Sequence, residues 1–322
     1  MPDIFEYLPR DRVGDRWVDR LAYSRDASVY RLVPEAVIRP KNEIEVRKLL
    51  EYSRRSGVPV TFRAAGTSLS GQSVTNGLIA EVVHDWQQFK ILDNGRAIKL
   101  QPGVNGSVAN NLLRPFSRKI GPDPASINAA RIGGIVSNNS SGMICGTQFN
   151  SYHTLQNIRF IMVNGQEYDT SSVEECDRFR LSEPTLSEGL LSIRDKILKN
   201  DNLSERIRQK YRIKNTMGYS MNAFLDFDEP LDIFSHLLVG AEGTLAFISS
   251  VVLETIPDPQ EKATGLIQFD SPEIACEFVP FLSGQGAAAV ELMDDQSLRT
   301  AVHICLLYTS DAADEGLGVD LG

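Results

Sequence analysis

Residues 62–74 read FRAAGTSLSGQSV, a loop of small residues that follows an apolar run at residues 58–62. Four residues separate Gly66 from Gly71, which is the glycine spacing of an ATP-binding phosphate loop. Such a loop places a lysine after the second glycine, because that ammonium neutralises the β and γ phosphates. Gln72 occupies this position, and the loop also lacks the G-x-G-x-x-G spacing of dinucleotide folds. Both common phosphate-binding motifs are therefore disfavoured.

The loop follows a predicted strand–helix–strand unit at residues 36–63. AVIR and VPVTF have the apolar, β-branched character of strands. Between them Asn42 can cap a helix that Gly57 ends, with apolar positions that include Ile44, Leu49 and Leu50. Loops at the carboxyl ends of strands are where α/β proteins usually place ligands. This context favours a ligand-binding role for the loop.

A second unusual segment lies at residues 121–147, GPDPASINAARIGGIVSNNSSGMICGT. Its Gly, Ser and Asn content is typical of a linker. Apolar residues are nevertheless threaded through it, at Ile127, Ile132, Ile135, Val136, Met143 and Ile144. A free linker has no use for such residues. We therefore predict an ordered segment whose backbone approaches a flat or phosphorylated ligand closely.

Several further elements follow from the patterning of the first two thirds of the chain. Strands are expected near residues 78–83 and 97–101, and a helix at residues 107–114. IRFIMVNGQEYDT, at residues 158–170, predicts a β-hairpin because Asn-Gly is a strong two-residue turn signal.

The last third of the chain is predicted to contain helices and a domain boundary. Residues 188–211 are expected to form a helix capped by Ser187, and a second helix is expected to begin at Pro230. The stretch PDPQEK, at residues 257–262, has two prolines flanked by charge and reads as the boundary. A strand and a helix capped by Ser271 are expected after it.

Composition limits the class of protein. The 322 residues are 42% hydrophobic and 23% charged, as in an ordinary globular protein long enough for two domains. The formal net charge is −9 and the basic residues are scattered, so nucleic acid is not expected as a partner. No apolar run approaches the roughly 20 residues that cross a bilayer, and the charged N-terminus does not resemble a secretory signal. We therefore expect no transmembrane segment.

Cysteine and histidine spacing gives no metal site. The cysteines form no C-x-x-C pair and no two of the four histidines have ligand spacing. Widely spaced single cysteines suit a reducing cytoplasm. We expect no metal or iron–sulfur cluster in this chain.

Three glycine-rich turns, each next to a predicted strand, suggest one extended ligand. They lie at residues 63–72, 133–142 and 240–244 and carry Ser, Thr and Asn but almost no cations. Runs of backbone N–H groups can bind an anion without a lysine. The pyrophosphate of a dinucleotide fits this chemistry, with Arg63 supplying one formal charge.

Four stretches carry a resemblance to a known family: PVTFRAAGTSLSGQ, GPDPASINAARIGGIVSNNSSG, KNTMGYSMNAFLDF and LLVGAEGTLAFIS. In order, spacing and content they resemble the flavoprotein superfamily of vanillyl-alcohol oxidase and p-cresol methylhydroxylase, in its D-2-hydroxy-acid dehydrogenase branch. Within that branch, RKIGPDPASI and YRIKNTMGY look most like the bacterial respiratory D-lactate dehydrogenases that carry a C-terminal iron–sulfur region. The resemblance implies an α+β fold, with a two-subdomain FAD-binding part of the p-cresol methylhydroxylase type followed by the start of an α/β cap (substrate) domain.

The resemblance also implies which residues hold FAD. The first loop would enclose the pyrophosphate, a turn at residues 122–126 would pass near the flavin ring, and the other two turns would line the dinucleotide. The residues that match are Arg63, Ala64, Ala65, Gly66, Thr67, Ser68, Gly71, Gln72, Pro122, Asp123, Ser126, Gly133, Gly134, Asn138, Asn139, Ser141, Gly142, Glu242 and Gly243. No histidine lies in residues 63–74, so the FAD is expected to be non-covalent, with His153 the outside candidate for an attachment point.

The implied domain organisation leaves the chemistry incomplete. Residues 1–29 would be an N-terminal segment, residues 30–257 the FAD-binding domain with its subdomains split near residues 90–100, and residues 258–304 the beginning of the cap domain. In the family the cap supplies most substrate-holding groups and a divalent metal, so the catalytic residues are not identified. An iron–sulfur cluster would likewise belong to the full-length parent.

The end of the chain has a different character. From Cys305, CLLYTSDAADE has no counterpart in the family and resembles the read-through translation of a sequencing-library adapter. Residues 305–322 are therefore expected to be a non-native tail of assembled metagenomic reads. The chain would then be a truncated fragment that binds FAD but oxidises its substrate poorly or not at all.

The implied function is FAD-dependent oxidation of a D-2-hydroxy acid, D-lactate to pyruvate first, with electrons passed to a quinone or cytochrome at the cytoplasmic face of the membrane. Alternatives stay open: a dehydrogenase of the same fold acting on glycolate or D-2-hydroxyglutarate, a flavoprotein acting on a nucleotide-sugar enol ether, or a catalytically incomplete flavin-binding protein. A phosphate-loop nucleotide hydrolase is made improbable by Gln72.

Overall fold

The computed structural model describes residues 2–142, 144–216 and 218–301. The chain divides into two compact units, Met1–Glu261 and Lys262–Gly322. The predicted non-native tail at residues 305–322 lies outside the described residues. Within the described part, no helix is both long enough and apolar enough to cross a membrane.

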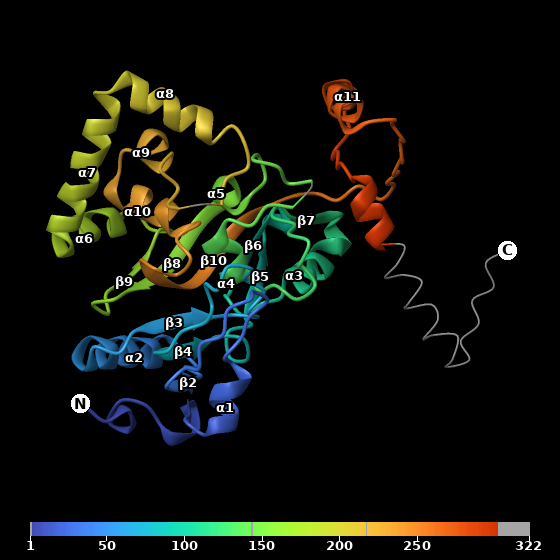
Figure 1. The fold of residues 1–322 in the computed structure, drawn as a ribbon. Coiled ribbons are helices and arrows are strands. Elements are labelled where there is room, and N and C mark those ends of the chain that lie inside the picture. The colour runs from blue at the N-terminus through green and yellow to red at the C-terminus, as the bar shows by residue number, and fades with distance from the viewer. Residues whose placement is uncertain (1, 143, 217, 302–322) are drawn as a thin grey trace, which may run out of the picture. The chain divides into compact units, whose positions relative to one another are not determined.

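The first half of unit 1 is a small sheet with one crossover helix (Figure 1). Its strands are β1 (Val13–Gly14), β2 (Ala36–Ile38), β3 (Val60–Arg63) and β4 (Leu78–Glu81). The strand order is β1-β2-β4-β3; β4 pairs parallel with β2 and β3, whereas β1 is antiparallel to β2. Two short 3₁₀ helices (Ile4–Glu6 and Arg10–Arg12) and α1 (Trp17–Ala22) precede the parallel strands.

The crossover helix α2 (Glu43–Ser56) forms where the sequence predicts it. The side chain of Asn42 accepts from the backbone N of Glu45 at 3.0 Å, and Gly57 ends the helix with φ 75°. The buried face consists of Val46, Leu49, Leu50 and Tyr52. Ile44 lies on the opposite side and is 61% exposed, so the predicted apolar position there is not a core position.

The second half of unit 1 is built on a larger antiparallel sheet. Its strands are β5 (Phe89–Leu92), β6 (Ala97–Leu100), β7 (Arg118–Ile120), β8 (Leu155–Met162), β9 (Glu167–Asp169) and β10 (Ala246–Pro257). They run in the order β5-β6-β10-β8-β9, and β7 pairs with β10. A 3₁₀ turn (Asp93–Gly95) joins β5 to β6. The predicted hairpin is confirmed as β8–β9, with Gly165 at φ 87°.

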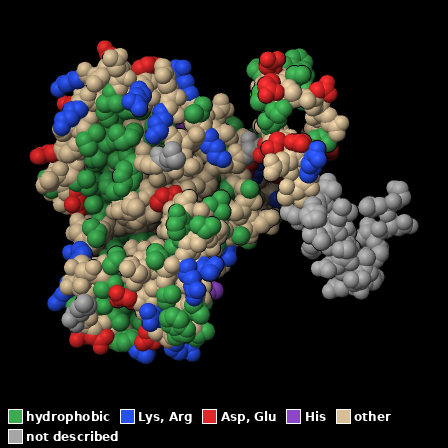
Figure 2. All heavy atoms as spheres, in the orientation of Figure 1, with side chains coloured by type: hydrophobic (Ala, Val, Ile, Leu, Met, Phe, Trp, Pro, Cys, Tyr) green, Lys and Arg blue, Asp and Glu red, His purple; other side chains and the backbone are tan. Residues whose placement is uncertain are grey.

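Helices cover one face of this sheet and bury the main core (Figure 1). They are α3 (Gly106–Leu113), followed by a 3₁₀ turn (Arg114–Phe116), then α4 (Ile132–Asn138), α5 (Ser151–Thr154), α6 (Glu174–Ser182), α7 (Pro184–Leu198), α8 (Asp201–Lys210), α9 (Ala223–Asp226) and α10 (Pro230–Leu238). Figure 2 shows hydrophobic side chains gathered over the helical side of this unit, with basic and acidic side chains interspersed elsewhere.

One predicted helix boundary is wrong. The region predicted as a single helix at residues 188–211 is two helices, α7 and α8, separated at Asn200. Ser187 is buried inside α7 rather than capping it, because the helix begins earlier, with Pro184 at its first position. Asn200 caps α8 by accepting from the backbone N of Leu203 at 3.0 Å.

An apolar and aromatic cluster joins the two halves of unit 1. Val46 and Leu50 of α2 pack with Trp86 and with Phe247 on the second sheet. The Phe247 ring lies 5.0 Å from Trp86, whose indole N donates to the carbonyl oxygen of Pro40 at 2.7 Å. The halves are therefore held in a fixed relation, and loops from both can contribute to one site.

Unit 2 contains α11 (Pro272–Gly284), capped as predicted by Ser271, whose hydroxyl accepts from the backbone N of Ile274 at 3.4 Å. The strand predicted between the boundary and this helix is not found: residues 263–270 have no strand pairing in the described part of the chain.

Candidate functional site

The loop after β3 is shaped by two glycines in the left-handed region. Gly66 has φ 70° and Gly71 has φ 79°, conformations that glycine adopts without steric cost. A Cβ on Gly66 would lie 2.5 Å from the Arg63 guanidinium, and one on Gly71 would lie 2.8 Å from the ring of Tyr30. Glycine is therefore favoured by φ at both positions, and a larger residue would also require Arg63 or Tyr30 to move.

The same loop presents free backbone donors. In the described chain, the N–H groups of residues 65–68 donate to no protein acceptor. The loop is fixed from behind instead: the backbone N of Ala27 donates to the carbonyl oxygen of Gly66 at 3.0 Å, and the Ser73 hydroxyl donates to Asp26 at 3.0 Å. Free amides on a rigid glycine turn are the chemistry that binds phosphate oxygens.

Arg63 supports this loop from beneath. Its side chain is 9% exposed, and Nη1 donates to the carbonyl oxygens of Tyr23 at 3.1 Å and Ser73 at 3.4 Å. Burial lowers the pKa of its guanidinium, while the negative charges of Asp26 and Glu81 oppose that shift. The structure thus shows Arg63 in contact with the loop backbone; a charge interaction with phosphate stays a prediction.

The Gly/Ala/Ser/Asn segment is ordered, as predicted. Its centre is α4, whose Ile132, Ile135 and Val136 are buried in the main core. Asn139 ends the helix with φ 50°, and its side-chain oxygen accepts from the backbone N of Tyr152 at 3.1 Å. This bond fixes the position at which the chain turns away from α4.

Asp123 and Gly142 bring the two ends of this segment together. A Cβ on Gly142 would fall 1.7 Å from the carbonyl oxygen of Asp123, so only glycine fits. The Asp123 carboxylate accepts from the backbone N of Cys145 at 3.2 Å and of Ile144 at 3.3 Å. The close backbone approach at Gly142 is made to the protein itself, and the predicted approach to a flat or phosphorylated ligand stays a prediction.

The third turn joins the other two through Glu242. Its backbone N donates to the carbonyl oxygen of Ser137 at 2.8 Å, and Asn138 Nδ2 donates to Glu242 Oε1 at 2.5 Å. The Gln72 side chain also interacts favourably with the ionised Glu242 carboxylate. Burial raises the pKa of Glu242, and these two amides oppose the shift. The side chains of Gln72, Asn138 and Glu242, one from each glycine-rich turn, meet at one point.

The remaining predicted residues differ in packing and exposure. Gly134 faces Ala64, with 4.0 Å between its ideal Cβ position and the alanine Cβ, whereas Gly133 packs against Pro102. Gly243 has φ 73° and no atom within 4 Å of its ideal Cβ position. Pro122 and Ser141 are buried, and Ala65 and Ser126 are exposed; Thr67 and Ser68 are half-buried.

Sequence reasoning missed a buried polar cluster behind the segment. The Tyr152 hydroxyl donates to Asp226 at 2.7 Å, and Asn222 donates to the same carboxylate oxygen at 3.1 Å. The ring of Tyr152 also lies 5.1 Å from that of His236. Tyr152 and Asp226 are 74 positions apart, and no spacing in the sequence connects them. His153, the outside candidate for flavin attachment, has an exposed side chain next to this cluster.

No metal centre is assembled in the parts of the chain that the structure describes, where no group of three or more His, Cys, Asp or Glu is placed to hold an ion. The described cysteines Cys145, Cys176 and Cys276 are free.

Comparison with known proteins identifies the class. Residues 34–171 match the profile of the FAD binding domain family. A D-2-hydroxyglutarate dehydrogenase of Haemophilus influenzae is 27% identical over 333 residues, covering 96% of this chain and 32% of that protein. The glycolate oxidase subunit GlcD of Bacillus subtilis is 25% identical over 296 residues, covering 89% of this chain and 52% of that protein. A solved structure of alkyldihydroxyacetonephosphate synthase has a TM-score of 0.54 at 14% identity, over 81% of this chain and 42% of that one.

Residues 34–171 match an FAD-binding domain, the fold is that of the solved structure above, and the cofactor is FAD. The predicted fold class and flavin are confirmed. The chain spans about a third of the length of the D-2-hydroxyglutarate dehydrogenase and about half of the GlcD subunit that it matches.

FAD fits the residues that are present. The free amides of residues 65–68 suit the pyrophosphate, and the junction of Gln72, Asn138 and Glu242 offers polar groups from all three turns. When bound, FAD supplies a ring that accepts two electrons. This chain's own residues would bind and orient it.

Proposed function

We propose that this chain is the FAD-binding part of a dehydrogenase that oxidises a D-2-hydroxy acid, with D-2-hydroxyglutarate as the first candidate substrate. The observation that supports it is the similarity to the Haemophilus influenzae enzyme over 96% of the chain. The convergence of the three turns at Glu242 supports the cofactor-binding half of the proposal.

D-lactate, the substrate favoured by the sequence motifs, becomes a second candidate. The relatives compared above are named for D-2-hydroxyglutarate and glycolate rather than for D-lactate. Glycolate is a third candidate, favoured by the match to GlcD over 89% of the chain. All three acids share a carboxylate next to the hydroxyl-bearing carbon, so one type of flavin chemistry serves them all.

The reaction removes two hydrogens from the substrate: the C–H hydrogen leaves as hydride and the hydroxyl hydrogen leaves as a proton. This part of the chain would hold the redox cofactor in a fixed position, so that the substrate C–H bond meets the flavin in one orientation. The groups that bind the substrate carboxylate and accept the proton are proposed to lie in the cap domain. A respiratory quinone or cytochrome, reached from the cytoplasmic face of the membrane, is the proposed electron acceptor.

A chimera tests the substrate assignment. Residues 1–257 would replace the matching segment of the Haemophilus influenzae enzyme, and dye-linked turnover would be measured with D-2-hydroxyglutarate, D-lactate and glycolate. We expect the chimera to bind FAD and to turn over D-2-hydroxyglutarate. A chimera that folds and holds FAD but turns over none of the three acids would contradict the proposal.

A further inference from the structure

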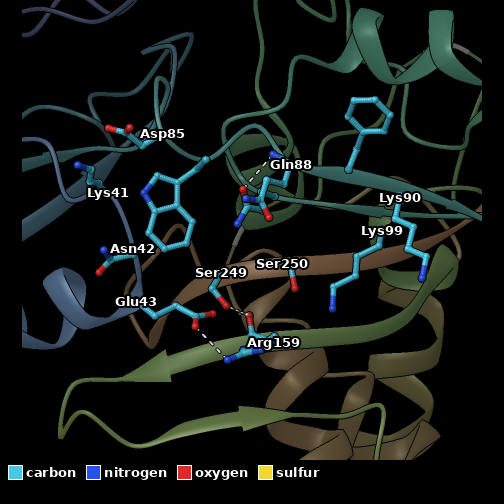
Figure 3. Close-up of a pocket in the computed structure, with 13 residues that line it drawn as sticks. Lys41, Asn42, Glu43, Asp85, Gln88, Lys90, Lys99, Arg159, Ser249 and Ser250 are labelled. Atoms are coloured by element: carbon cyan, nitrogen blue, oxygen red, sulfur yellow. Dashed lines mark hydrogen bonds and ion pairs between the residues drawn. The ribbon is translucent and has the colours of Figure 1, made fainter.

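A polar cavity of about 530 Å³ lies between α2 and the second sheet, and it shares no residue with the three glycine-rich turns (Figure 3). Its cations are Lys41, Lys90, Lys99 and Arg159, whereas its carboxylates are Glu43 and Asp85. Positive charge therefore exceeds negative charge by two within the cavity wall.

Two of these cations stand in an unfavourable arrangement. Lys90 on β5 and Lys99 on β6 are directly opposed in the antiparallel register. Figure 3 shows both side chains extending side by side along the cavity. Like charges directly opposite each other on one face of a sheet are destabilising.

The carboxylates of the cavity do not neutralise this pair. Glu43 accepts from Arg159 Nη2 at 2.9 Å, and Asp85 faces Arg12 at 4.0 Å. In the described parts of the chain, no carboxylate oxygen lies within 4.0 Å of the ammonium of Lys90 or Lys99. Both lysines are therefore free to bind another anion.

Protection of a sheet edge explains only one of the two lysines. β5 is the edge strand of the sheet, and lysine on an edge strand discourages pairing with other chains. Lys99 lies on β6, one strand inside the edge, and its side chain is half-buried. A second cation at that interior position calls for a different explanation.

Ser250 completes the arrangement. It lies on β10 opposite Arg159 of β8, while Lys99 pairs with Val252, two residues along β10. Figure 3 places the Ser250 side chain between those of Lys99 and Arg159. Within the described residues the neighbouring Ser249 hydroxyl donates to the carbonyl oxygen of Arg159 at 3.3 Å, whereas the Ser250 hydroxyl donates to no protein acceptor. Two free ammonium groups and a free hydroxyl thus line one wall.

We propose that this cavity binds a small dianion, with its oxygen atoms held by Lys90, Lys99 and the Ser250 hydroxyl. Lysine ammonium groups act as compact point charges and accept either phosphate or carboxylate oxygens. The shared chemistry is two negative charges on oxygen, which a phosphate monoester and a short dicarboxylate both carry. All three groups belong to the second sheet, whereas Glu43 of α2 lines the cavity without being assigned a contact to the ligand.

The test measures the thermal unfolding midpoint of the whole chain, with FAD present, against inorganic phosphate and separately malonate, at ionic strength held constant with chloride. We expect a saturable rise in the midpoint, and an apparent Kd at least about tenfold weaker in a Lys90→Gln/Lys99→Gln variant. Lys196→Gln on α7 removes one positive charge outside the cavity, as Lys99→Gln does inside it. This control should leave the Kd unchanged. The tighter of the two probes identifies the source of the dianion.

A second readout does not depend on the ligand. Without phosphate or malonate, Lys99→Gln should raise the midpoint relative to the parent chain, because it removes the repulsion from Lys90. Neither probe raising the parent midpoint, or an equal rise in the parent and the double variant, would overturn the proposal. If the double variant fails to fold, the Kd of the single Lys99→Gln variant decides the question in the same way.

Discussion

Asn138 and Glu242, 104 positions apart in the chain, are joined by a hydrogen bond of 2.5 Å from the amide nitrogen to the carboxylate. The Gln72 side chain interacts with the same carboxylate and favours its ionised form. A carboxylate that is half-buried and holds side chains from two other turns fixes their spacing. The prediction that the three turns form one binding surface is consistent with this geometry.

Gly66→Ala is expected to reduce FAD affinity by at least about tenfold. The new methyl group would lie 2.5 Å from the Arg63 guanidinium, so Arg63 must move and loosen the loop. Alanine at φ 70° also costs roughly 1 kcal/mol of folding free energy. Titration of flavin fluorescence gives the affinity, and denaturant unfolding gives the stability.

Gly165→Ala is the matched control for this change. Gly165 has φ 87°, no atom within 4 Å of its ideal Cβ position, and a place in the β8–β9 hairpin away from the three turns. It should lose a similar roughly 1 kcal/mol of stability with FAD affinity unchanged. Equal FAD affinities in the two variants would show that loop geometry at Gly66 does not govern binding.

Glu242→Gln is expected to remove a pH dependence of stability in the FAD-free chain. Burial raises the pKa of Glu242 above its ordinary 4.5 in the folded state, so the folded chain holds this proton more tightly than the unfolded chain. Its contribution to stability is fully present below pH 4.5 and is lost as pH rises through the raised pKa. Chemical denaturation measured across that pH range should show a smaller decrease in the free energy of unfolding for the variant than for the parent chain.

Glu254→Gln controls for the loss of one carboxylate from the protein. Glu254 lies on β10, twelve residues after Glu242 in the chain. Its side chain is exposed. This variant should keep the pH dependence of the parent chain. A Glu242→Gln variant with an unchanged profile would mean that the carboxylate is not the group that titrates.

Asn139 is expected to separate two effects, one from its side chain and one from its backbone. Replacement by Gly or by Ala removes the acceptor for the backbone N of Tyr152, which costs about 1–3 kcal/mol because the amide is buried. Only Ala adds roughly 1 kcal/mol more, since the residue has φ 50°. Urea denaturation would measure both; equal stability of Asn139→Ala and Asn139→Gly would disprove the backbone contribution.

The sequence was sufficient where local chemistry determines the structure. Asn42 and Gly57 set the ends of α2, and Asn-Gly set the β8–β9 turn. The prediction that the segment at residues 121–147 is ordered followed from its apolar residues, which a linker would not carry. Prediction from the sequence failed where two helix-start signals compete. Ser187 has the chemistry of an N-cap, but the helix begins at Pro184 and Ser187 is buried within it.

Contacts between distant residues had no local signal. Tyr152 with Asp226, and Tyr30 beneath Gly71, depend on tertiary packing within one half of unit 1. Glu242 with Gln72 depends on how the two halves pack. The Lys90–Lys99 pair is similar, because it needs the register of β5 on β6 before the repulsion becomes visible.

Reconstitution of the purified chain with FAD tests the central claim most directly. The protein would be mixed with FAD, freed of excess flavin by gel filtration and scanned for flavin absorbance, with circular dichroism to establish that it is folded. We predict about one FAD per chain, released by acid precipitation because the flavin is non-covalent. A folded chain that retains no flavin would contradict the assignment of the three glycine-rich turns, and flavin that stays with the acid-precipitated protein would contradict non-covalent binding.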